Sequence, residues 1–452
     1  MSRRAGISFL ALAFVMSLMV SVSAFADSQA RVVRLSDVQG DVQIDRATGQ
    51  GYEKAFLNIP ITQDTRLKTA SDGRAEVEFE DGTVIHLTPG SAIEFTSLSL
   101  RDSGARVSSV DVQKGEAYFN FAGKKDDEFT VSFLHQKATL TQSAHFRVNL
   151  NNDAKASLAV FKGEVVVDGP QGQIEVGKKQ TAEFTLADNE QAALVKNIDA
   201  DPFDGWDKQQ GEYHDRYSNS KSYAGGPSYG ASDLSYYGNY MNVPGYGMMW
   251  QPYFTGIGWD PFMDGAWMWY PGFGYTWVSA YPWGWLPYHY GGWAFVPGFG
   301  WLWSPGSSFV VFNPVVPVIR PPAHFVPPRP PVVAASHSTV VVGRGFTPSS
   351  SLVPRATVVV RGTSAGLGVP RGISNLGRIN QEVARTGAVA VPSTTRVTTG
   401  SGGGMHGGGM SSGRSSGSQM SGSRMSSGGH TSSGGMSSGG GHTSASHSGS
   451  HH

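Results

Sequence analysis

An aromatic repeat between Gly238 and Pro305 constrains the fold of this chain more than any other feature. Three cores recur every 26 to 27 residues and begin at Tyr240, Trp267 and Trp293. Each core has an aromatic residue first, Pro-Gly four residues later and Trp ten residues later. Proline presets φ, and glycine accepts a positive φ, at the two central positions of a type II turn. Each core is therefore expected to form a β-hairpin.

Each predicted hairpin has one strongly aromatic face. Tyr275 and Trp277 stand two residues apart, as do Trp301 and Trp303, and side chains at that spacing share a face of a strand. A lone hairpin of this size is marginally stable in water. The three hairpins are therefore expected to stack on one another or on the preceding region.

The rings of this repeat allow two interpretations. As ligand-stacking residues they would lie flat against sugar rings, and the candidates are Trp259, Trp267, Trp277, Trp285, Trp293 and Trp303. As core residues they would fill a small β-array that has few other apolar side chains. We favour the core for most rings, and any aromatic surface left exposed would mark an interaction site.

Residues 30–195 read as consecutive short strands separated by Gly, Asp, Asn and Ser. Apolar and charged residues alternate over residues 75–79. Ala, Val and Phe of this segment are expected to face a core, and Glu76 and Glu78 to face water. The Asp-Gly pair at 81–82 then predicts a hairpin.

A Gly-acid-apolar unit opens a strand three times, at Gly40, Gly115 and Gly163. Glycine at such a position permits a bulge or a tight corner, and the acid can point outward. The repetition suggests stacked, similar β-units.

The stretch from Val33 to Val167 resembles the FecR domain, a periplasmic module named for an iron-citrate transport regulator. The resemblance rests on Val38-Gln-Gly-Asp-Val42, on residues 75–91 and on Gly115-Glu-Ala-Tyr-Phe119. It implies an all-β module that binds or relays signals and performs no chemistry.

Residues 233–303 resemble a bacterial domain of unknown function that often follows FecR-type modules in exported proteins. The tyrosine, proline and tryptophan residues that this region shares with that domain are Tyr240, Pro244, Trp250, Pro252, Pro287, Tyr288 and Trp293. This resemblance supports the pairing of the two domains and implies no activity.

A short amphipathic helix is expected between the two regions. Asp201 before Pro202 is typical of a helix start. The residues that recur at three- and four-residue spacing are Phe203, Trp206, Gln210, Tyr213 and Tyr217. This face is expected to pack on a neighbouring β-region, and residues 218–232 are expected to be a linker.

The chain from residue 307 to 452 has too few core-forming residues to fold alone and is expected to be a disordered tail. It is proline-dense over 314–331 and consists mostly of Gly, Ser, Met and His from residue 400. Two short segments, 340–342 and 358–360, could pair as strands. The histidines and methionines would suit copper as ligands, but their spacing is irregular and we favour a solvated tail without a metal site.

Charge is distributed unevenly, although the formal net charge is zero. Residues 27–232 contain 31 acidic and 22 basic residues, whereas residues 307–452 contain eleven Arg and a single Glu. The arginines of the tail are expected to contact anionic partners, either envelope polymers or the acidic first region of the chain itself.

The N-terminus has the pattern of a secretion signal. Ser2 to Arg4 are followed by an apolar stretch from Ile7 to Val22 and by Ala24-Phe-Ala26, which predicts cleavage before Asp27. An uncleaved signal anchor is the alternative. The absence of cysteine excludes a lipid-anchored lipoprotein and disulfides. Frequent prolines rule out a membrane helix in the aromatic region.

The expected fold is therefore mainly β. It comprises a signal peptide (1–26), a FecR-like domain of stacked short strands (30–195), a helix and linker (196–236), an aromatic hairpin array (237–306) and the tail (307–452). We expect an exported protein in the periplasm, on the cell surface or outside the cell, with no integral membrane span after cleavage.

The favoured function is non-catalytic binding or scaffolding in the cell envelope, with an unknown envelope protein or polysaccharide as partner. We expect no nucleic-acid partner and no catalytic residue, cofactor or metal. The alternative is a FecR-type signal-sensing protein linked to regulation of a transcription factor. A glycan-active enzyme would need a carboxylate pair in a cleft, for which the repeat offers only Asp260 and Asp264.

Overall fold

The structure is a computed structural model. It describes residues 31–151, 155–185, 192–218, 229–312, 317–332, 337–343 and 357–393. The expected signal peptide, most of the expected linker and the segment from residue 400 lie outside these residues. The chain is mainly β, as the sequence predicted.

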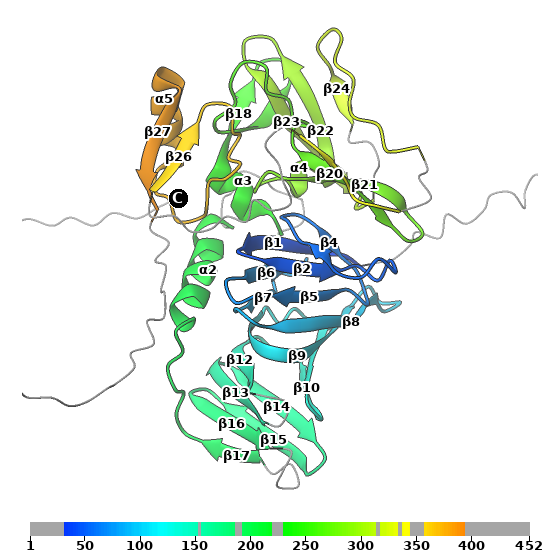
Figure 1. The fold of residues 1–452 in the computed structure, drawn as a ribbon, viewed down its shortest axis with the longest axis vertical. Helices are drawn as coiled ribbons and strands as arrows, with labels where there is room; N and C mark the ends of the chain where they lie inside the picture. Colours follow the sequence, from blue (N-terminus) through cyan, green and yellow to red (C-terminus); the bar gives the residue numbers. More distant parts are fainter. Residues whose placement is uncertain are drawn as a thin grey trace, which may run out of the picture. The chain divides into compact units, whose positions relative to one another are not determined.

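The first region contains the strands up to residue 195 (Figure 1). Their bounds are β1 (Val33–Gln39), β2 (Val42–Asp45), β3 (Glu53–Lys54), β4 (Pro60–Ile61), β5 (Arg66–Thr69), β6 (Arg74–Glu78), β7 (Val84–Leu87), β8 (Ala92–Leu100), β9 (Arg106–Phe121), β10 (Glu128–Phe133), β11 (Gln136–Leu140), β12 (Ala144–Leu150), β13 (Lys155–Lys162), β14 (Glu164–Gly169), β15 (Gly172–Gly177), β16 (Gln180–Thr185) and β17 (Ala192–Val195).

The three Gly-acid units form tight corners, as predicted. Gly40, Gly115 and Gly163 have φ of 66°, 73° and 78°. A Cβ on Gly40 would lie 2.1 Å from the carbonyl oxygen of Asp72, so only glycine fits there. The strand partners change at these corners. Before Gly40, β1 pairs with β6, and after it β2 pairs with β5. At Gly115 the partner of β9 changes from β8 to β12.

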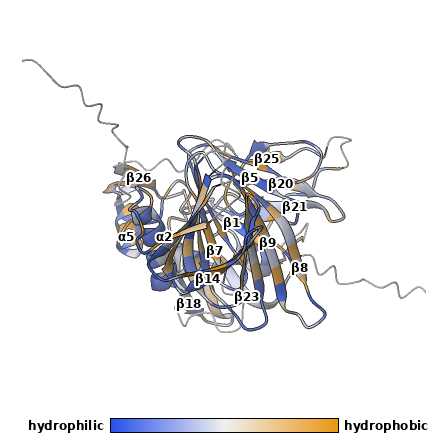
Figure 2. Cartoon of the chain, turned by 90° about the horizontal axis from the view of Figure 1, so that it is seen from below, coloured by the Kyte–Doolittle hydropathy of each residue, from blue (hydrophilic) through white to orange (hydrophobic). Residues whose placement is uncertain are grey.

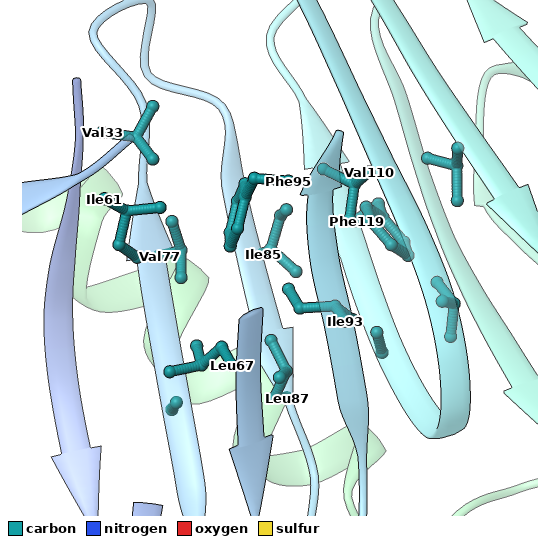
Figure 3. Close-up of a cluster of buried hydrophobic side chains, with 14 of the residues drawn as sticks. Val33, Ile61, Leu67, Val77, Ile85, Leu87, Ile93, Phe95, Val110 and Phe119 are labelled. Atoms are coloured by element: carbon teal, nitrogen blue, oxygen red, sulfur yellow. The ribbon is translucent and has the colours of Figure 1, made fainter. Parts of the chain in front are cut away.

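Alternating apolar side chains of these strands form one hydrophobic core. Hydrophobic and hydrophilic residues alternate along β8 and β9 (Figure 2). Figure 3 shows Val77, Ile85 and Phe95 within this core, and all three are fully buried. The Asp-Gly pair at 81–82 joins β6 to β7 as an antiparallel hairpin, which confirms that prediction.

The second region contains helices and hairpins. Its elements are α2 (Asp204–Tyr217), α3 (Ala231–Tyr237), β18 (Gly238–Val243), β19 (Gly247–Pro252), β20 (Gly265–Tyr270), β21 (Gly274–Ser279), α4 (Leu286–His289), β22 (Tyr290–Val296), β23 (Gly300–Phe309), β24 (Val318–Arg320), β25 (Val340–Val342), β26 (Thr357–Arg361), α5 (Leu376–Thr386) and β27 (Ala388–Pro392).

The three predicted hairpins are present, as β18–β19, β20–β21 and β22–β23. Their Pro-Gly pairs occupy the turns, where Gly245, Gly272 and Gly298 have φ of 78°, 79° and 83°. In the second hairpin the N–H of Phe273 donates to the carbonyl of Tyr270 over 3.1 Å. These features fit a type II turn and confirm the prediction.

The hairpins stack in both of the expected ways. The first and third pair through β19 and β23. The second is two-faced: Ala266 and Met268 belong to the core of the first region, whereas Trp267 and Trp277 belong to an aromatic core of the second region. The hydroxyl of Tyr270 donates to the carbonyl of Pro60 over 2.7 Å. The hairpin β20–β21 therefore joins the two cores.

Residues 357–393 differ from the expected disordered tail, because they fold as β26, α5 and β27. The hydroxyl of Tyr236 donates to the carbonyl of Ile373 over 2.7 Å. The indole N–H of Trp283 donates to the carbonyl of Ala365 over 2.6 Å. Val369 and Ile373 are buried in the aromatic core. The segment has few apolar residues of its own, but it inserts them into a core that other elements provide.

The expected pairing between 340–342 and 358–360 is wrong. β25 (Val340–Val342) pairs with β20, and β26 pairs with β27. Across the described ranges, no helix combines the length and apolar character needed to cross a membrane.

Candidate functional site

The outer face of β6 is buried, which corrects the expectation that its two glutamates face water. Glu76 is 0% exposed and Glu78 is 4% exposed. The alternation itself holds, because Ala75 and Val77 lie in the hydrophobic core. The side chains of His214 on α2 and of Arg371 bind Glu76, and the backbone N–H of Gly230, which precedes α3, binds Glu78.

Arg34 of β1 joins the first region to α3. Its guanidinium is completely buried and donates to Glu78 over 3.1 Å and, through a shorter contact, to Asp233. It also donates to the side-chain oxygen of Asn58 over 3.1 Å and to the carbonyl of Pro282 over 3.1 Å. A buried charge is tolerated when it is paired and hydrogen-bonded in this way.

Arg371 brings the C-terminal segment to the same place. Its Nη1 donates to Glu76 over 2.7 Å, and its Nη2 donates to Asp233 over 3.2 Å and to the carbonyl of Ser36 over 3.2 Å. Its guanidinium carbon lies 4.4 Å from the ring centre of Tyr213. An arginine of the expected tail thus contacts the acidic first region, in a buried position.

The arginines lower the pKa of two of the three carboxyl groups that they bind. Burial raises the pKa of Asp233, but the charges of Arg371 and Arg34 outweigh burial and hold this pKa below its usual value. Burial also raises the pKa of Glu76, but Arg371 and His214 overcome it and hold this pKa well below the usual range. Glu78 differs, because burial dominates and raises its pKa.

Histidines extend the cluster along α2. His86 donates from Nδ1 to Asp207 over 2.7 Å and from Nε2 to Glu76 over 3.1 Å. His214 contacts Glu76 over 3.0 Å, and His145 contacts Asp207 over 2.9 Å. These contacts bring His86 and His145 together through one carboxylate, although no spacing in the sequence links the two histidines.

The carboxylates raise the pKa of His86 and of His214. Burial lowers the pKa of His86, but hydrogen bonds to Asp207 and Glu76 more than compensate and raise it to about 9. Burial raises the pKa of Asp207, but hydrogen bonds from His145 and His86 lower it to about 2. Burial lowers the pKa of His214, and the charge of Glu76 raises it above its usual value.

We name this set the junction network, and its members are Arg34, Glu76, Glu78, His86, Asp207, His214, Asp233 and Arg371. The network contains four acidic and four basic side chains. It connects β1, β6 and β7 with α2, α3 and the segment before α5. Its chemistry suits coupling between these elements, because all of its contacts except His86–Glu76 join residues far apart in sequence.

A cavity of about 490 Å³ lies beside the junction network. One side is the face of α2 that carries Trp206, Gln210 and Tyr213, and the other includes Tyr236 and residues 371–375. The helix face matches the predicted one, and Trp206 packs against His86 with ring centres 5.3 Å apart. The helix begins later than predicted, since the side chain of Asp201 accepts from the N–H of Phe203 and α2 begins at Asp204.

The six tryptophans predicted as ligand-stacking candidates all lie in the aromatic core. Their exposed fractions are 5% for Trp259, 3% for Trp267, 2% for Trp277 and 0% for Trp285, Trp293 and Trp303. The indole N–H of Trp303 donates to the carbonyl of Tyr290 over 2.7 Å, and that of Trp259 donates to the hydroxyl of Tyr281 over 3.0 Å. They match the core interpretation, and stacking on a ligand stays a prediction that would require this core to open.

The network itself was missed at the level of sequence. Asp207, Gln210 and His214 lie among the aromatic residues of the predicted helix face, and a polar residue on an apolar face indicates a buried polar partner. That signal could have located the α2 side of the site. Among the residues described, no group of three or more His, Asp or Glu side chains is arranged to hold a metal ion.

The solved structures that match this chain include two crystal structures, at 1.65 and 2.50 Å resolution, of a protein described as "a putative anti-sigma factor from Parabacteroides distasonis". Each is 23% identical, with a TM-score of 0.26, and the match covers 31% of this chain. It spans 63% of the other chain, less than two thirds of its length. No curated protein matches this chain.

Family comparisons match two parts of the chain. Residues 65–166 match the family described as FecR protein, and residues 231–320 match a family of unknown function, DUF6600. Both matches agree with the resemblances seen in the sequence. The chain therefore carries a FecR region followed by a DUF6600 region.

Proposed function

We propose that this chain is an exported, non-catalytic sensor of the FecR type, in which the junction network couples the FecR region to the aromatic region and the output is altered transcription. The FecR match supports the sensing role. The observation that carries the coupling is a pair of arginines, Arg34 and Arg371. Each of them binds Asp233 and one glutamate of the first region. Leaving one of these charges unpaired is costly, so a change on one side must affect the other.

Complementation of a deletion strain tests the proposal. We expect deletion to change a defined set of transcripts, which the wild-type chain restores. Arg371→Gln should fail to restore them, because it removes the charge that binds Glu76 and Asp233. Arg378→Gln, at an exposed position on α5, is the matched control and should restore them. Immunoblots must show equal amounts of the three proteins.

Two outcomes would contradict the sensing role. One is a deletion strain with unchanged transcripts. The other is full restoration by Arg371→Gln at wild-type abundance. Export is tested separately by cell fractionation and by sequencing the N-terminus of the mature protein, which we expect to begin at Asp27.

A scaffolding role in the envelope is the other prediction from the sequence. Co-sedimentation of the mature protein with purified peptidoglycan and with envelope polysaccharides tests it directly. Stoichiometric sedimentation together with an unchanged transcriptome in the deletion strain would favour scaffolding over sensing.

A further inference from the structure

A second cluster of ionisable side chains lies where the strands β7, β9 and β12 run side by side. Tyr118 of β9 is the register partner of His86 on β7 and of Arg147 on β12. Glu116 stands two residues before Tyr118, so the two side chains share a face of β9. We name this set the Glu116 cluster, and its members are Glu116, Tyr118, Arg147, Asn149, Asp201 and Asp204.

The Glu116 cluster holds the start of α2 on the strands β9 and β12. The guanidinium of Arg147 donates from Nη1 to Asp204 over 2.7 Å and from Nη2 to the carbonyl of Asp199 over 3.0 Å. The hydroxyl of Tyr118 donates to Asp204 over 2.8 Å, and the N–H of Asp201 donates to the same carboxylate over 2.9 Å. Residues 199–204 are thus fixed to the two strands mainly through Asp204.

Glu116 is the member whose surroundings suit a charged carboxylate least. It is 5% exposed. Its Oε2 accepts from the amide of Asn149 over 2.7 Å, whereas Nε of Arg147 lies 3.6 Å from this oxygen, beyond hydrogen-bonding distance. Its Oε1 is buried and accepts no hydrogen bond within the described part of the chain. Because a buried carboxylate with unfilled acceptor positions is costly, this position favours the neutral carboxyl group.

The charges within the cluster do not balance. Its charged groups are Glu116 on β9, Arg147 on β12, Asp201 before α2 and Asp204 at the start of α2. Tyr118 is uncharged at neutral pH, because burial raises its pKa above the usual value of 10.0. Three carboxyl groups therefore share one guanidinium, and that guanidinium is already bound to Asp204.

The neighbouring histidines do not supply the missing positive charge. His86 and His145 are both bound to Asp207. Burial and the charge of Asp201 raise the pKa of Glu116 to about 7, although its two partners on β12 oppose this rise. The cluster thus agrees with the hydrogen bonding in favouring a protonated Glu116.

We propose that the Glu116 cluster is a pH-dependent latch, which closes residues 199–204 on β9 and β12 when Glu116 carries a proton and releases them when Glu116 gives that proton to the solvent. The released form is favoured because an ionised Glu116 repels Asp201. The consequence for signalling rests on the proposed function, since α2 also carries Asp207 and His214 of the junction network. The opening itself is measured without any response of the cell.

The direction of the pH effect follows from the proton that Glu116 binds. Its pKa is about 7 with residues 199–204 closed and returns toward 4.5 when water reaches it, so the closed form holds one extra proton between these values. Opening is therefore least favourable below pH 4.5, becomes more favourable as the pH rises and levels off above pH 7. Between pH 5 and pH 8 the equilibrium constant for opening should rise about 50- to 100-fold.

Hydrogen exchange of the full mature chain, followed by mass spectrometry, tests the latch. Exchange rates divided by the intrinsic rate at each pH give the protection of residues 201–210. In the wild-type chain this protection should fall about 50- to 100-fold between pH 5 and pH 8. Glu116→Gln keeps a neutral side chain at every pH and should limit the fall to about threefold. Asp201→Asn removes the repelling charge and should make the fall smaller than in the wild type.

Glu183→Gln is the matched control, since Glu183 is exposed on β16, and it should behave as the wild type. Constant wild-type protection between pH 5 and pH 8, or a full fall in Glu116→Gln, would overturn the latch. If Glu116→Gln does not fold, Asp201→Asn decides, and an unchanged fall in that variant overturns the latch. A working latch in a chain whose deletion leaves transcripts unchanged would contradict the sensing role alone. Protection that is independent of pH in a chain that restores the transcripts would contradict the latch alone.

Discussion

At the scale of the residue, Glu76 is the centre of the junction network. It accepts from His86 over 3.1 Å, from His214 over 3.0 Å and from Arg371 over 2.7 Å. Glu76 is fully buried, so none of these cationic partners can be replaced by water. Each of the three therefore contributes to keeping the carboxylate ionised in the folded chain.

The pH dependence of stability should report on His86. Its pKa is raised to about 9 from the usual 6.5, so its contribution is fully present below pH 6.5 and is lost as the pH rises through 9. The loss should be on the order of 3 kcal/mol. Urea denaturation of the full chain between pH 6.5 and 9.5 measures it. His86→Gln should flatten the profile, whereas His135→Gln, at an exposed position, should not. An equal slope in His86→Gln would contradict this role.

At the scale of the element, the hairpin β20–β21 links two cores because its side chains alternate between them. Met268 belongs to the core of the first region, and the neighbouring Trp267 belongs to the aromatic core. Its turn is like those of the other two hairpins, but β18–β19 and β22–β23 pair with each other instead. The position of a hairpin, rather than its turn, decides what it joins.

A matched pair of methionines tests this link. Met268→Ala should destabilise the chain by about 2–5 kcal/mol, because Met268 is 0% exposed. Met248→Ala, in the first hairpin, should change stability by less than about 0.5 kcal/mol, because Met248 is 52% exposed. Chemical denaturation measures both. Similar effects of the two substitutions would show that the hairpin does not join the cores.

The turns and the alternation of strands could be predicted because they depend on a few adjacent residues. Pro-Gly pairs and the glycines of the corners set φ locally, and the structure shows them as expected. The burial of Glu76 could not be predicted, because it depends on α2 and on residue 371, far along the sequence. The helix start was misplaced because Asp201 hydrogen-bonds to the N–H of Phe203 and forms a turn before the helix.

At the scale of the whole molecule, the hairpin β20–β21 and the junction network both join the FecR region to the aromatic region. Residues 357–393 contribute to the aromatic core and to the junction network. They supply Val369 and Ile373 to the core and Arg371 to the network. Composition suggested that this segment could not fold alone and would be disordered. That inference holds for a segment by itself, but here a core assembled from distant elements receives its few apolar side chains.

A double-mutant cycle between the regions tests whether they unfold as one unit. Arg34→Met and Asp233→Asn should each cost about 3–5 kcal/mol, because each leaves a buried charge without its partner. The double variant should cost at least about 1 kcal/mol less than the sum of the two, since it removes both charges. The exposed pair Arg66 and Glu94 is the control, and its coupling should not exceed about 1 kcal/mol. Additive effects at Arg34 and Asp233 would mean that the contact closes only after each region has folded independently, and the network could then not relay a change between them.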